Sequence, residues 1–241
     1  MGIACDSAPR NLASPNKETI RDFFEGIASR YDPVNSLLSF SLDENWRRRA
    51  ARSILKDRSA SQTILDLGVG TGKFLRKFLD LQSWRHAVGT DFAGEMLRIS
   101  RGSLPSPCEF VQADIHDLPF KGSSFDLVVS AFTLRSVKDR RHFFFEIRRV
   151  LTPRGSAGFL CLTRPTSIWG RMVYAPYLKF YLPFMGGFLS KSPAAYRFLS
   201  ESIQAFPSPR EIAEELRASG FRSISLIPFT FGISTLILAE K

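Results

Sequence analysis

The chain has 241 residues, of which 44% are hydrophobic and 23% are charged, and its formal net charge is +10. A chain of this length with 22 Phe residues can bury enough apolar surface to fold, so a largely disordered protein is excluded. We predict one globular domain over residues 16–241, preceded by a flexible Ser- and Pro-rich segment at 1–15. The positive charge leaves three kinds of anionic partner open: nucleic acid, a bilayer surface or an acidic small ligand.

The three cysteines, Cys5, Cys108 and Cys161, have the spacing of neither a zinc knuckle nor a redox pair. No cluster of His, Cys and carboxylate residues has metal-ligand spacing either, so no metal is expected. The first ten residues contain no apolar secretory core, and Asp6 stands where a myristoylation site needs Ser or Thr. We therefore expect a cytoplasmic protein without an acyl anchor.

The N-terminal part of the domain is expected to form a helical cap at about 18–56. Pro33 is predicted to end its first helix, because proline lacks the amide that a helix interior needs. A second helix is predicted at 46–55. The apolar side chains that recur at helical spacing in the first helix, 18–30, are Ile20, Phe23, Phe24, Ile27 and Ala28.

Short apolar runs then alternate with helical segments of about ten to fifteen residues. This alternation is typical of βαβ units, and it predicts an α/β fold with a parallel sheet covered by helices on both faces. Two final strands lie close enough to pair as a hairpin, which adds an antiparallel strand at the end of the sheet. The expected strands are TILDL from residue 63, 87–91, 109–114, 125–132, 156–163, 221–228 and 231–239, with helices around Met96 and Ile99 and at 138–151, 194–204 and 209–219.

An aromatic-rich stretch at 168–189 interrupts this rhythm, within an expected lid-like insertion at about 166–206. Its charges, Arg171 and Lys179, together with its prolines and paired glycines, argue against a membrane span. Its aromatic residues suit the boundary between lipid and water, so a surface lid or interfacial segment is one interpretation. A helix pair packed on the sheet edge is the other, and the sequence leaves both open.

Three glycines follow the first predicted strand in LDLGVGTG, residues 65–72. Gly68, Gly70 and Gly72 let the backbone turn sharply and approach a ligand without Cβ atoms in the way. Their spacing is tighter than the dinucleotide pattern, and Asp66 precedes them on the strand. A carboxylate there suits a cationic amino-acid group better than a pyrophosphate, which favours S-adenosylmethionine over a nicotinamide dinucleotide. A structural glycine turn in another α/β fold is the alternative.

Two further aspartates end predicted strands. Asp91 can accept hydrogen bonds from both ribose hydroxyls of a nucleoside, and Asp114 can accept one from an adenine amine, with Ile115 packed on the ring. Each aspartate alone is more often a helix cap. Because ligands of parallel sheets bind beyond the carboxyl ends of the strands, Asp66, Asp91 and Asp114 together predict a nucleoside site.

Several longer runs carry a resemblance to a known family. LDLGVGTG, VGTD, QADIHDLPF, SSFDLVVSAF and RVLTPRGSAGFL resemble the class I S-adenosylmethionine-dependent methyltransferases. YDPVNSLLSFSLDENWRR, FTLRSVKD and YRFLSESIQAFPSPREIAEELRASGFRSI are similar to the UbiE/MenG/COQ5 family, and the match covers about residues 18–241. The resemblance implies a Rossmann-like fold with a mostly parallel seven-stranded sheet and an antiparallel C-terminal strand. It also implies S-adenosylmethionine as cofactor and C-methylation of a prenylated quinol ring, with demethylmenaquinol as the first choice and the ubiquinone precursor as the second.

The resemblance also assigns roles to residues. Arg135 would stabilise the oxyanion that develops on the quinol ring or orient a water, because a guanidinium is too basic to take the proton itself. Tyr31 and Asp32 would close over the site and orient the ring. An ion pair with Asp139 is the structural alternative for Arg135. The residues expected to bind the cofactor are Asp66, Gly68, Gly70, Thr71, Gly72, Asp91, Phe92, Asp114, Ile115 and Ala131.

Five positions depart from the family's usual residues, and they are Asp43, Ala131, Thr133, Cys161 and Ile237. Asp43 begins an Asp-Glu-Asn run where the family has a His-Arg pair, so no imidazole is available there. We expect cofactor binding to survive these changes. Most of them are expected to line the acceptor side, which leaves the identity of the quinol open.

Two other functions stay open on the sequence. The charge supports an RNA methyltransferase, but the Phe spacing in the basic run at 140–149 favours packing on the sheet over stacking on bases. The departures support a protein that binds S-adenosylmethionine without catalysis. The apolar insertion and the excess of Lys and Arg favour a prenylated substrate taken from an anionic membrane by peripheral contact, and a homodimer is left open.

Overall fold

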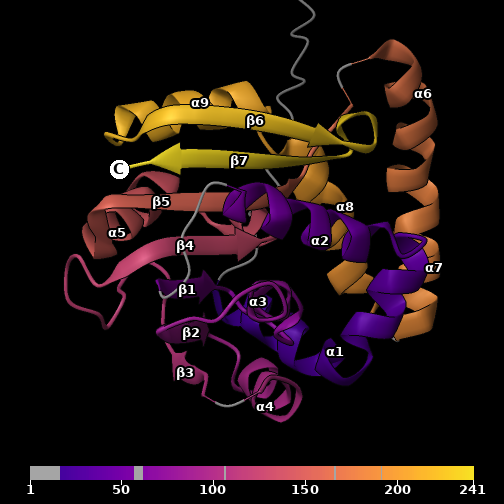
Figure 1. The fold of residues 1–241 in the computed structure, drawn as a ribbon. Coiled ribbons are helices and arrows are strands. Elements are labelled where there is room, and N and C mark those ends of the chain that lie inside the picture. The colour runs from indigo at the N-terminus through magenta and orange to yellow at the C-terminus, as the bar shows by residue number, and fades with distance from the viewer. Residues whose placement is uncertain (1–16, 57–61, 106, 166, 191) are drawn as a thin grey trace, which may run out of the picture.

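A seven-stranded sheet in the order β3-β2-β1-β4-β5-β7-β6 carries the fold (Figure 1). The computed structural model describes residues 17–56, 62–105, 107–165, 167–190 and 192–241, and the segment predicted to be flexible, 1–15, lies outside them. Strand β7 runs antiparallel to both of its neighbours, whereas the other pairs are parallel, which confirms the predicted fold class. The strands are β1 (Thr63–Leu67), β2 (His86–Asp91), β3 (Glu109–Gln112), β4 (Phe125–Ala131), β5 (Leu151–Leu162), β6 (Arg222–Phe229) and β7 (Ser234–Glu240).

Helices cover both faces of this sheet, as the alternation predicted. Helices α5 and α9 pack on one face, and α2 and α3 pack on the other. Phe143 and Phe144 of α5 are fully buried, which confirms core packing for the run at 140–149. Strand β1 is buried in every residue, because helices cover it on both sides. The bounds are α2 (Leu42–Leu55), α3 (Lys73–Leu79), α4 (Gly94–Ser103), α5 (Arg140–Val150) and α9 (Pro209–Ala218), with short turns η1 (Leu134–Ser136) and η3 (Thr230–Gly232).

A further group of helices lies at the carboxyl ends of the parallel strands (Figure 1). In this group α1 and α8 both pack on α7 around a core of their own, which contains Ile27, Leu38, Leu178, Tyr196 and Ile203. These helices cover the edge at which ligands of parallel sheets bind. The elements are α1 (Lys17–Leu38), α6 (Ile168–Pro176), the π-helical turn η2 (Tyr177–Tyr181), α7 (Leu182–Ser190) and α8 (Pro193–Ala205).

Several boundaries differ from the prediction. Helix α2 begins earlier than predicted, at Leu42, and β7 begins later, at Ser234. Helix α1 runs through Pro33, so the helix end predicted there is wrong. Val34 and Leu38, in the turns after the proline, are buried in the core with α7 and α8, and this packing offsets the backbone hydrogen bond that proline cannot make. Strand β3 ends earlier than predicted, at Gln112, and β5 begins earlier, at Leu151.

The stretch 168–189 is helical and forms α6, η2 and α7. The stretch is therefore helical, as one of the two interpretations expected. It packs mainly on α1 and α8, however, and not on the edge of the sheet. The stretch buries Tyr174, Leu178 and Leu182 and exposes most of its other large apolar side chains. Within the described residues, no helix is long and apolar enough to cross a membrane.

Candidate functional site

Two cavities lie at the carboxyl ends of the strands and share part of one wall. Tyr31 of α1 and Phe132, which follows β4, line both of them. The larger, here the apolar cavity, has a volume of about 610 Å³, and the smaller, here the glycine-loop cavity, has a volume of about 450 Å³. The two cavities are therefore adjacent at Tyr31 and Phe132.

The apolar cavity is walled by aromatic and aliphatic side chains of α1, α2, α6 and α8. Its charged wall residues are Asp43, Arg47 and Arg135. Asp43 and Arg47 form a buried ion pair at 2.5 Å, and the Ser39 hydroxyl donates to Asp43 at 2.7 Å. Burial alone would raise the pKa of Asp43, but Arg47 and Ser39 hold that pKa below its usual value. Such a wall suits a large hydrophobic ligand with a polar end.

The glycine loop forms one side of the other cavity. Gly68, Gly70 and Gly72 have φ angles of 67°, 55° and 89°, a backbone region that favours glycine, as the sequence predicted. At Gly68 space is also limiting, because a Cβ atom there would lie 2.5 Å from Oγ1 of Thr133. Gly68 and Gly70 line the cavity, so the loop presents bare backbone to a ligand.

Asp91 joins the end of β2 to this loop. One carboxylate oxygen accepts from the Gly70 amide and the other from the Ala93 amide, each at 2.9 Å. Burial raises the pKa of Asp91, although these amides and that of Phe92 oppose the shift. The carboxylate is thus fixed at the cavity wall with lone pairs left to accept from a ligand.

Asp66 lies deeper, at the end of β1, and lines neither cavity. Burial raises its pKa well above the usual value, Arg47 lowers it, Asp91 raises it and the Leu75 amide lowers it. Within the described residues, neither carboxylate oxygen has a hydrogen-bond partner of good geometry. A buried carboxylate of this kind is more stable in its ionised form when a cation lies nearby.

Two arginines act on Tyr31 where the cavities meet. Burial raises the pKa of Tyr31, whereas Arg135 and Arg47 lower it. Arg47 also lies over the Phe132 ring, with Cζ 4.9 Å from the ring centroid, and the Trp46 ring contacts Phe132 edge-on. Phe132 has a φ of 62°, an uncommon backbone conformation for a bulky residue, and such conformations concentrate at functional sites.

Arg135, in the turn η1, lines the apolar cavity. Its Nη1 donates to Ser202 Oγ at 3.0 Å, and its buried Nε has no hydrogen-bond partner among the described residues. Burial lowers the pKa of Arg135 and Tyr31 raises it. The ion pair with Asp139 is not present in the described part of the chain, since Asp139 instead caps α5 by accepting from the His142 amide.

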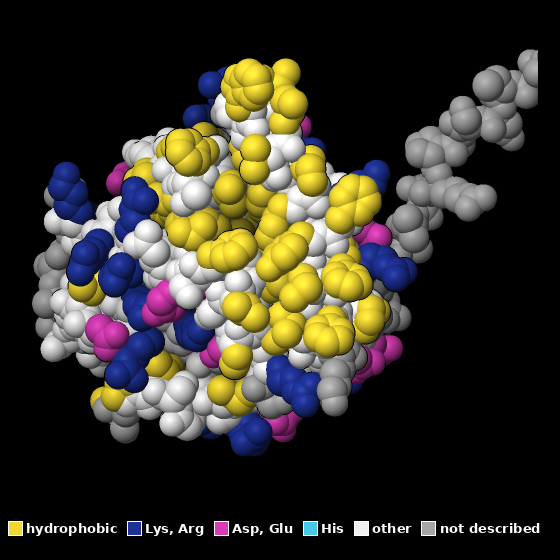
Figure 2. Space-filling model, turned by 90° about the vertical axis from the view of Figure 1, so that its right-hand side faces the viewer, with side chains coloured by type: hydrophobic (Ala, Val, Ile, Leu, Met, Phe, Trp, Pro, Cys, Tyr) yellow, Lys and Arg dark blue, Asp and Glu magenta, His cyan; other side chains and the backbone are white. Residues whose placement is uncertain are grey.

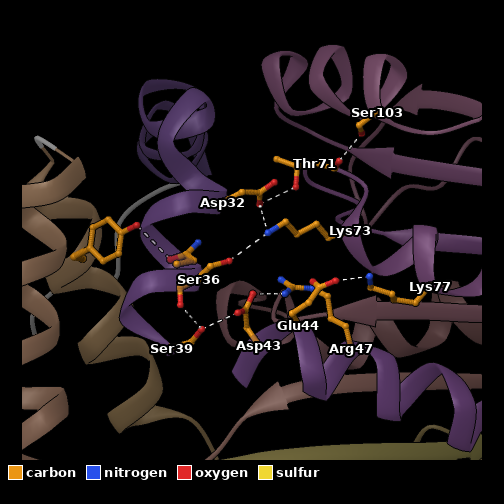
Figure 3. Close-up of polar contacts among 12 residues, drawn as sticks. Asp32, Ser36, Ser39, Asp43, Glu44, Arg47, Thr71, Lys73, Lys77 and Ser103 are labelled. Carbon is orange, nitrogen blue, oxygen red and sulfur yellow. Dashed lines mark hydrogen bonds and ion pairs between the residues drawn. The ribbon is translucent and has the colours of Figure 1, made fainter. Parts of the chain in front are cut away.

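Asp32 connects α1 to the glycine loop (Figure 3). Its Oδ1 accepts from Thr71 Oγ1 at 3.0 Å and lies 3.7 Å from Lys73 Nζ, which also donates to Ser36. The Thr71 carbonyl in turn accepts from Ser103 of α4 at 3.0 Å. Asp32 lines neither cavity, so its contacts hold the cap on the loop and do not place it against a ring in the apolar cavity.

Most of the predicted site residues meet at these cavities. Of the catalytic candidates, Arg135 lines the apolar cavity, Tyr31 lines both and Asp32 lines neither. Among the predicted cofactor residues, Asp66, Thr71 and Gly72 line neither cavity. Those that line the glycine-loop cavity are Gly68, Gly70, Asp91, Phe92, Asp114, Ile115 and Ala131.

The five departures from the family's usual residues do not gather on one side, so that expectation is wrong. Asp43 lines the apolar cavity, whereas Ala131 and Thr133 line the glycine-loop cavity. Cys161 and Ile237 are buried in the sheet core and line neither cavity. Ala131 and Thr133 therefore bear on the glycine-loop cavity more than on the apolar one.

Sequence reasoning missed several wall residues. Met96 lines the glycine-loop cavity from the first turn of the helix after Asp91, and its place beside a helix N-terminus is a signal that could have found it. Lys138 and His142 line the same cavity near the start of α5. Nothing in the sequence around Arg47 marks that residue, because its contacts are made across the fold.

Comparison with known proteins gives a family match over nearly the whole chain. Residues 12–241 match the model of the ubiE/COQ5 methyltransferase family. A demethylmenaquinone methyltransferase of Thermus thermophilus is 37% identical over 221 residues, which cover 90% of this chain and 99% of that protein. A demethylmenaquinone methyltransferase of Thermotoga maritima is 34% identical, covering 95% of this chain and 99% of that protein.

Solved structures with a similar fold include two further methyltransferases. One is an S-adenosylmethionine-dependent methyltransferase of Thermotoga maritima, described as a possible histamine N-methyltransferase, with a TM-score of 0.64 and 18% identity over 91% of this chain and 98% of that one. The other is a putative S-adenosylmethionine-dependent methyltransferase of Methanococcus maripaludis, with a TM-score of 0.62 and 19% identity over 90% of this chain and 94% of that one. At this identity the likeness supports the fold.

Proposed function

Because this chain belongs to the ubiE/COQ5 methyltransferase family, we propose that it transfers a methyl group to a ring carbon of a prenylated quinol. It is an S-adenosylmethionine-dependent methyltransferase. Demethylmenaquinol is the first choice of acceptor, since the relatives from Thermus and Thermotoga carry the name demethylmenaquinone methyltransferase. The ubiquinone precursor is the second choice.

The observation that carries the proposal is the wall shared by the two cavities. A methyl transfer needs donor and acceptor in line and in contact, and Tyr31 and Phe132 form the place where ligands of the two cavities meet. The apolar cavity suits a prenylated ring, because charged groups on its wall are few and two of them, Asp43 and Arg47, neutralise each other. A polar polymer such as RNA finds little to bind there.

The residues at the glycine-loop cavity fit S-adenosylmethionine. The buried carboxyl groups of Asp66 and Asp91 have raised pKa values, and a nearby cation would favour their ionised forms. Gly68 and Gly70 would approach the ligand with bare backbone, and Asp91 and Asp114 would accept hydrogen bonds from the nucleoside. When bound, the cofactor supplies a methyl group on a positively charged sulfur.

Arg135 would stabilise negative charge on the acceptor, and Tyr31 would orient its ring. The ring carbon of a quinol becomes a better nucleophile as an adjacent hydroxyl loses its proton, so a group that stabilises the phenolate favours reaction. Arg135 lines the apolar cavity, and its guanidinium would stabilise that oxygen by its charge. Tyr31 shares the wall with Phe132 and would orient the ring, while Asp32 would act at a distance by holding α1 on the glycine loop.

Methyl transfer tests the proposal directly. We expect purified protein incubated with methyl-labelled S-adenosylmethionine to label demethylmenaquinol and to leave bulk RNA unlabelled. Label in RNA alone would contradict the proposal in favour of an RNA methyltransferase. Label in neither substrate would favour a protein that binds the cofactor without catalysis. A quinone profile of a strain lacking the protein then identifies which quinol accumulates.

Peripheral contact with an anionic membrane forms part of the proposal, because a prenylated acceptor resides in the bilayer. The net charge of +10 supports attraction to anionic lipid headgroups. We therefore predict that binding to vesicles containing phosphatidylglycerol weakens as salt rises from low to physiological ionic strength, since salt screens surface charge. Vesicle flotation measures this, with phosphatidylcholine vesicles as the uncharged control. Binding that does not change with ionic strength would contradict the electrostatic part of the proposal.

A further inference from the structure

An apolar surface surrounds the mouth of the apolar cavity. Figure 2 shows hydrophobic side chains gathered around a hollow, with Lys and Arg side chains and fewer Asp and Glu side chains toward the edges of this face. Many of these side chains come from α6, η2 and α7, where Met172, Phe180, Phe184 and Phe188 are each more than half exposed. A large contiguous patch of exposed apolar side chains usually marks a binding surface.

The apolar surface and the cavity are continuous. Phe40, Trp169, Val173 and Phe231 line the apolar cavity and are also 70%, 75%, 79% and 87% exposed. We call the three aromatic residues among them, Phe40, Trp169 and Phe231, the aromatic rim. They come from three parts of the chain: the turn after α1, helix α6 and the turn η3. Whatever covers this surface therefore also faces the entrance of the cavity.

Two rim residues are exposed although their backbone conformation disfavours a bulky side chain. Phe40 has a φ of 53° and Phe231 a φ of 56°, both in the left-handed region that favours glycine. Their turns are anchored from below, since the Leu38 carbonyl accepts from the Tyr177 hydroxyl at 2.9 Å and Thr230 Oγ1 accepts from the Trp46 indole at 2.8 Å. The fold thus holds both rings largely exposed at a conformational cost, and the Phe40 ring stacks on Tyr181 with ring centroids 6.4 Å apart.

The charged residues around the apolar surface indicate which partner binds there. The sequence contains no Asp or Glu from residue 147 to residue 200, a span that supplies all of α6, η2 and α7 and the start of α8. Arg171, Lys179 and Arg197 are exposed there. A two-fold contact with a second copy would bring like charges together and would close the cavity mouth. Anionic phospholipid complements both the apolar residues and the surrounding cations.

We propose that this face docks on an anionic bilayer, with the aromatic rim inserted among the lipids so that the cavity mouth opens into the acyl region. The acceptor's prenyl chain would then pass from the bilayer into the cavity without crossing water. This last step rests on the proposed function, whereas the docking itself does not. Aromatic side chains beside Arg and Lys are the residues that bind at the level of lipid headgroups.

Vesicle partition of the full-length protein tests the docking without cofactor or acceptor. We expect the double variant Phe184→Ala with Phe188→Ala to lower the partition coefficient on phosphatidylcholine and phosphatidylglycerol vesicles by about tenfold or more, because two inserted rings are lost. Phe231→Gly should also lower it, and it should fold, because glycine suits the backbone at that position. The matched control is Phe145→Ala, which removes a ring that is 61% exposed on α5, away from the cavity.

A methyl-transfer assay with a short-chain, water-soluble quinol separates the two proposals. Phe184 and Phe188 do not line the cavity, so their double variant should methylate this acceptor as the wild type does. If the wild type methylates no quinol but its partition still depends on these residues, the proposed function fails and the docking stands. Equal partition of all variants would overturn the docking. A wild-type dimer that the double variant converts to monomer, with partition unchanged, would overturn it in favour of a second copy.

Discussion

Replacing Arg135 by Gln is expected to lower kcat for methyl transfer by about 10²–10³, the usual cost of removing a donor that stabilises a developing oxyanion. Arg135 lines the apolar cavity with a buried guanidinium, and it influences the pKa of Tyr31. We expect KM for the cofactor to change little, because Arg135 does not line the glycine-loop cavity. Steady-state kinetics at saturating cofactor measure both quantities.

Two further variants control for structural effects. Arg135→Lys should recover part of the lost activity, since it keeps the charge but not the planar donor geometry. Arg140→Gln removes an arginine that is paired with Glu215 and lines neither cavity, so it should leave kcat unchanged even if it lowers stability. If Arg135→Gln keeps most of the wild-type kcat, the role assigned to Arg135 is wrong.

The second large effect is expected at Asp91. Asp91→Asn should raise the dissociation constant for S-adenosylmethionine by at least about tenfold, since a hydrogen bond to a charged acceptor contributes about 1.5–3 kcal/mol. The amide would also set an N–H donor against the Gly70 or Ala93 amide, both of which now donate to the carboxylate. Calorimetric titration measures the change, and Asp80→Asn, at an exposed ion pair with Arg76, is the matched control. Unchanged cofactor affinity in Asp91→Asn would contradict the assignment.

The same titration should depend on pH. Burial raises the pKa values of Asp66 and Asp91, so part of this carboxyl pair stays protonated at a pH where ordinary aspartates are ionised. A cationic ligand prefers the ionised forms, and affinity should therefore rise with pH through the raised pKa values and level off above them. The stabilisation that these two carboxyl groups give the ligand-free protein should have the opposite pH dependence. It is fully present below the usual aspartate pKa and is lost as pH rises through the raised values. Asp66→Asn should reduce both pH dependences.

The sheet and its helices could be predicted because their signals are local. Apolar runs such as TILDL and the helical spacing in α5 and α9 are set within a few residues, and the packing of α5 and α9 on the sheet agrees with them. The end predicted at Pro33 failed because distant contacts decide there: Val34 and Leu38 pack on helices that are more than a hundred residues away in the chain. Tertiary packing can override the local preference of a proline.

The glycine-loop cavity was also predictable, since aspartates lie at or near the ends of three strands beside the glycine loop. The sequence could not separate residues that line the cavity, such as Asp91, from residues that support it, such as Asp66 and Thr71. That difference depends on which way each side chain leaves the backbone at the strand end. Thr71 turns to Asp32 on α1, a contact between segments that local periodicity does not connect.

The apolar cavity was the least predictable part. The apolar cavity forms between α1, α2, α6 and α8, which are far apart in the sequence, and Phe132 belongs to both cavities only because of its position in the fold. The left-handed conformations of Phe40 and Phe231 carry no sequence signal either, since glycine is the residue that marks such turns. The exposed rim could therefore be found only from the structure.

A structure of the protein with S-adenosylhomocysteine and demethylmenaquinol would test most directly whether the two cavities form one active site. The nucleoside should occupy the glycine-loop cavity beside Asp91, and the quinol ring should lie at Tyr31 and Phe132 with a ring oxygen in hydrogen-bond reach of Arg135. The prenyl chain should run through the apolar cavity toward the aromatic rim. A quinol bound outside the apolar cavity, or a ring that does not reach Tyr31 and Phe132 while the nucleoside is in place, would contradict this arrangement.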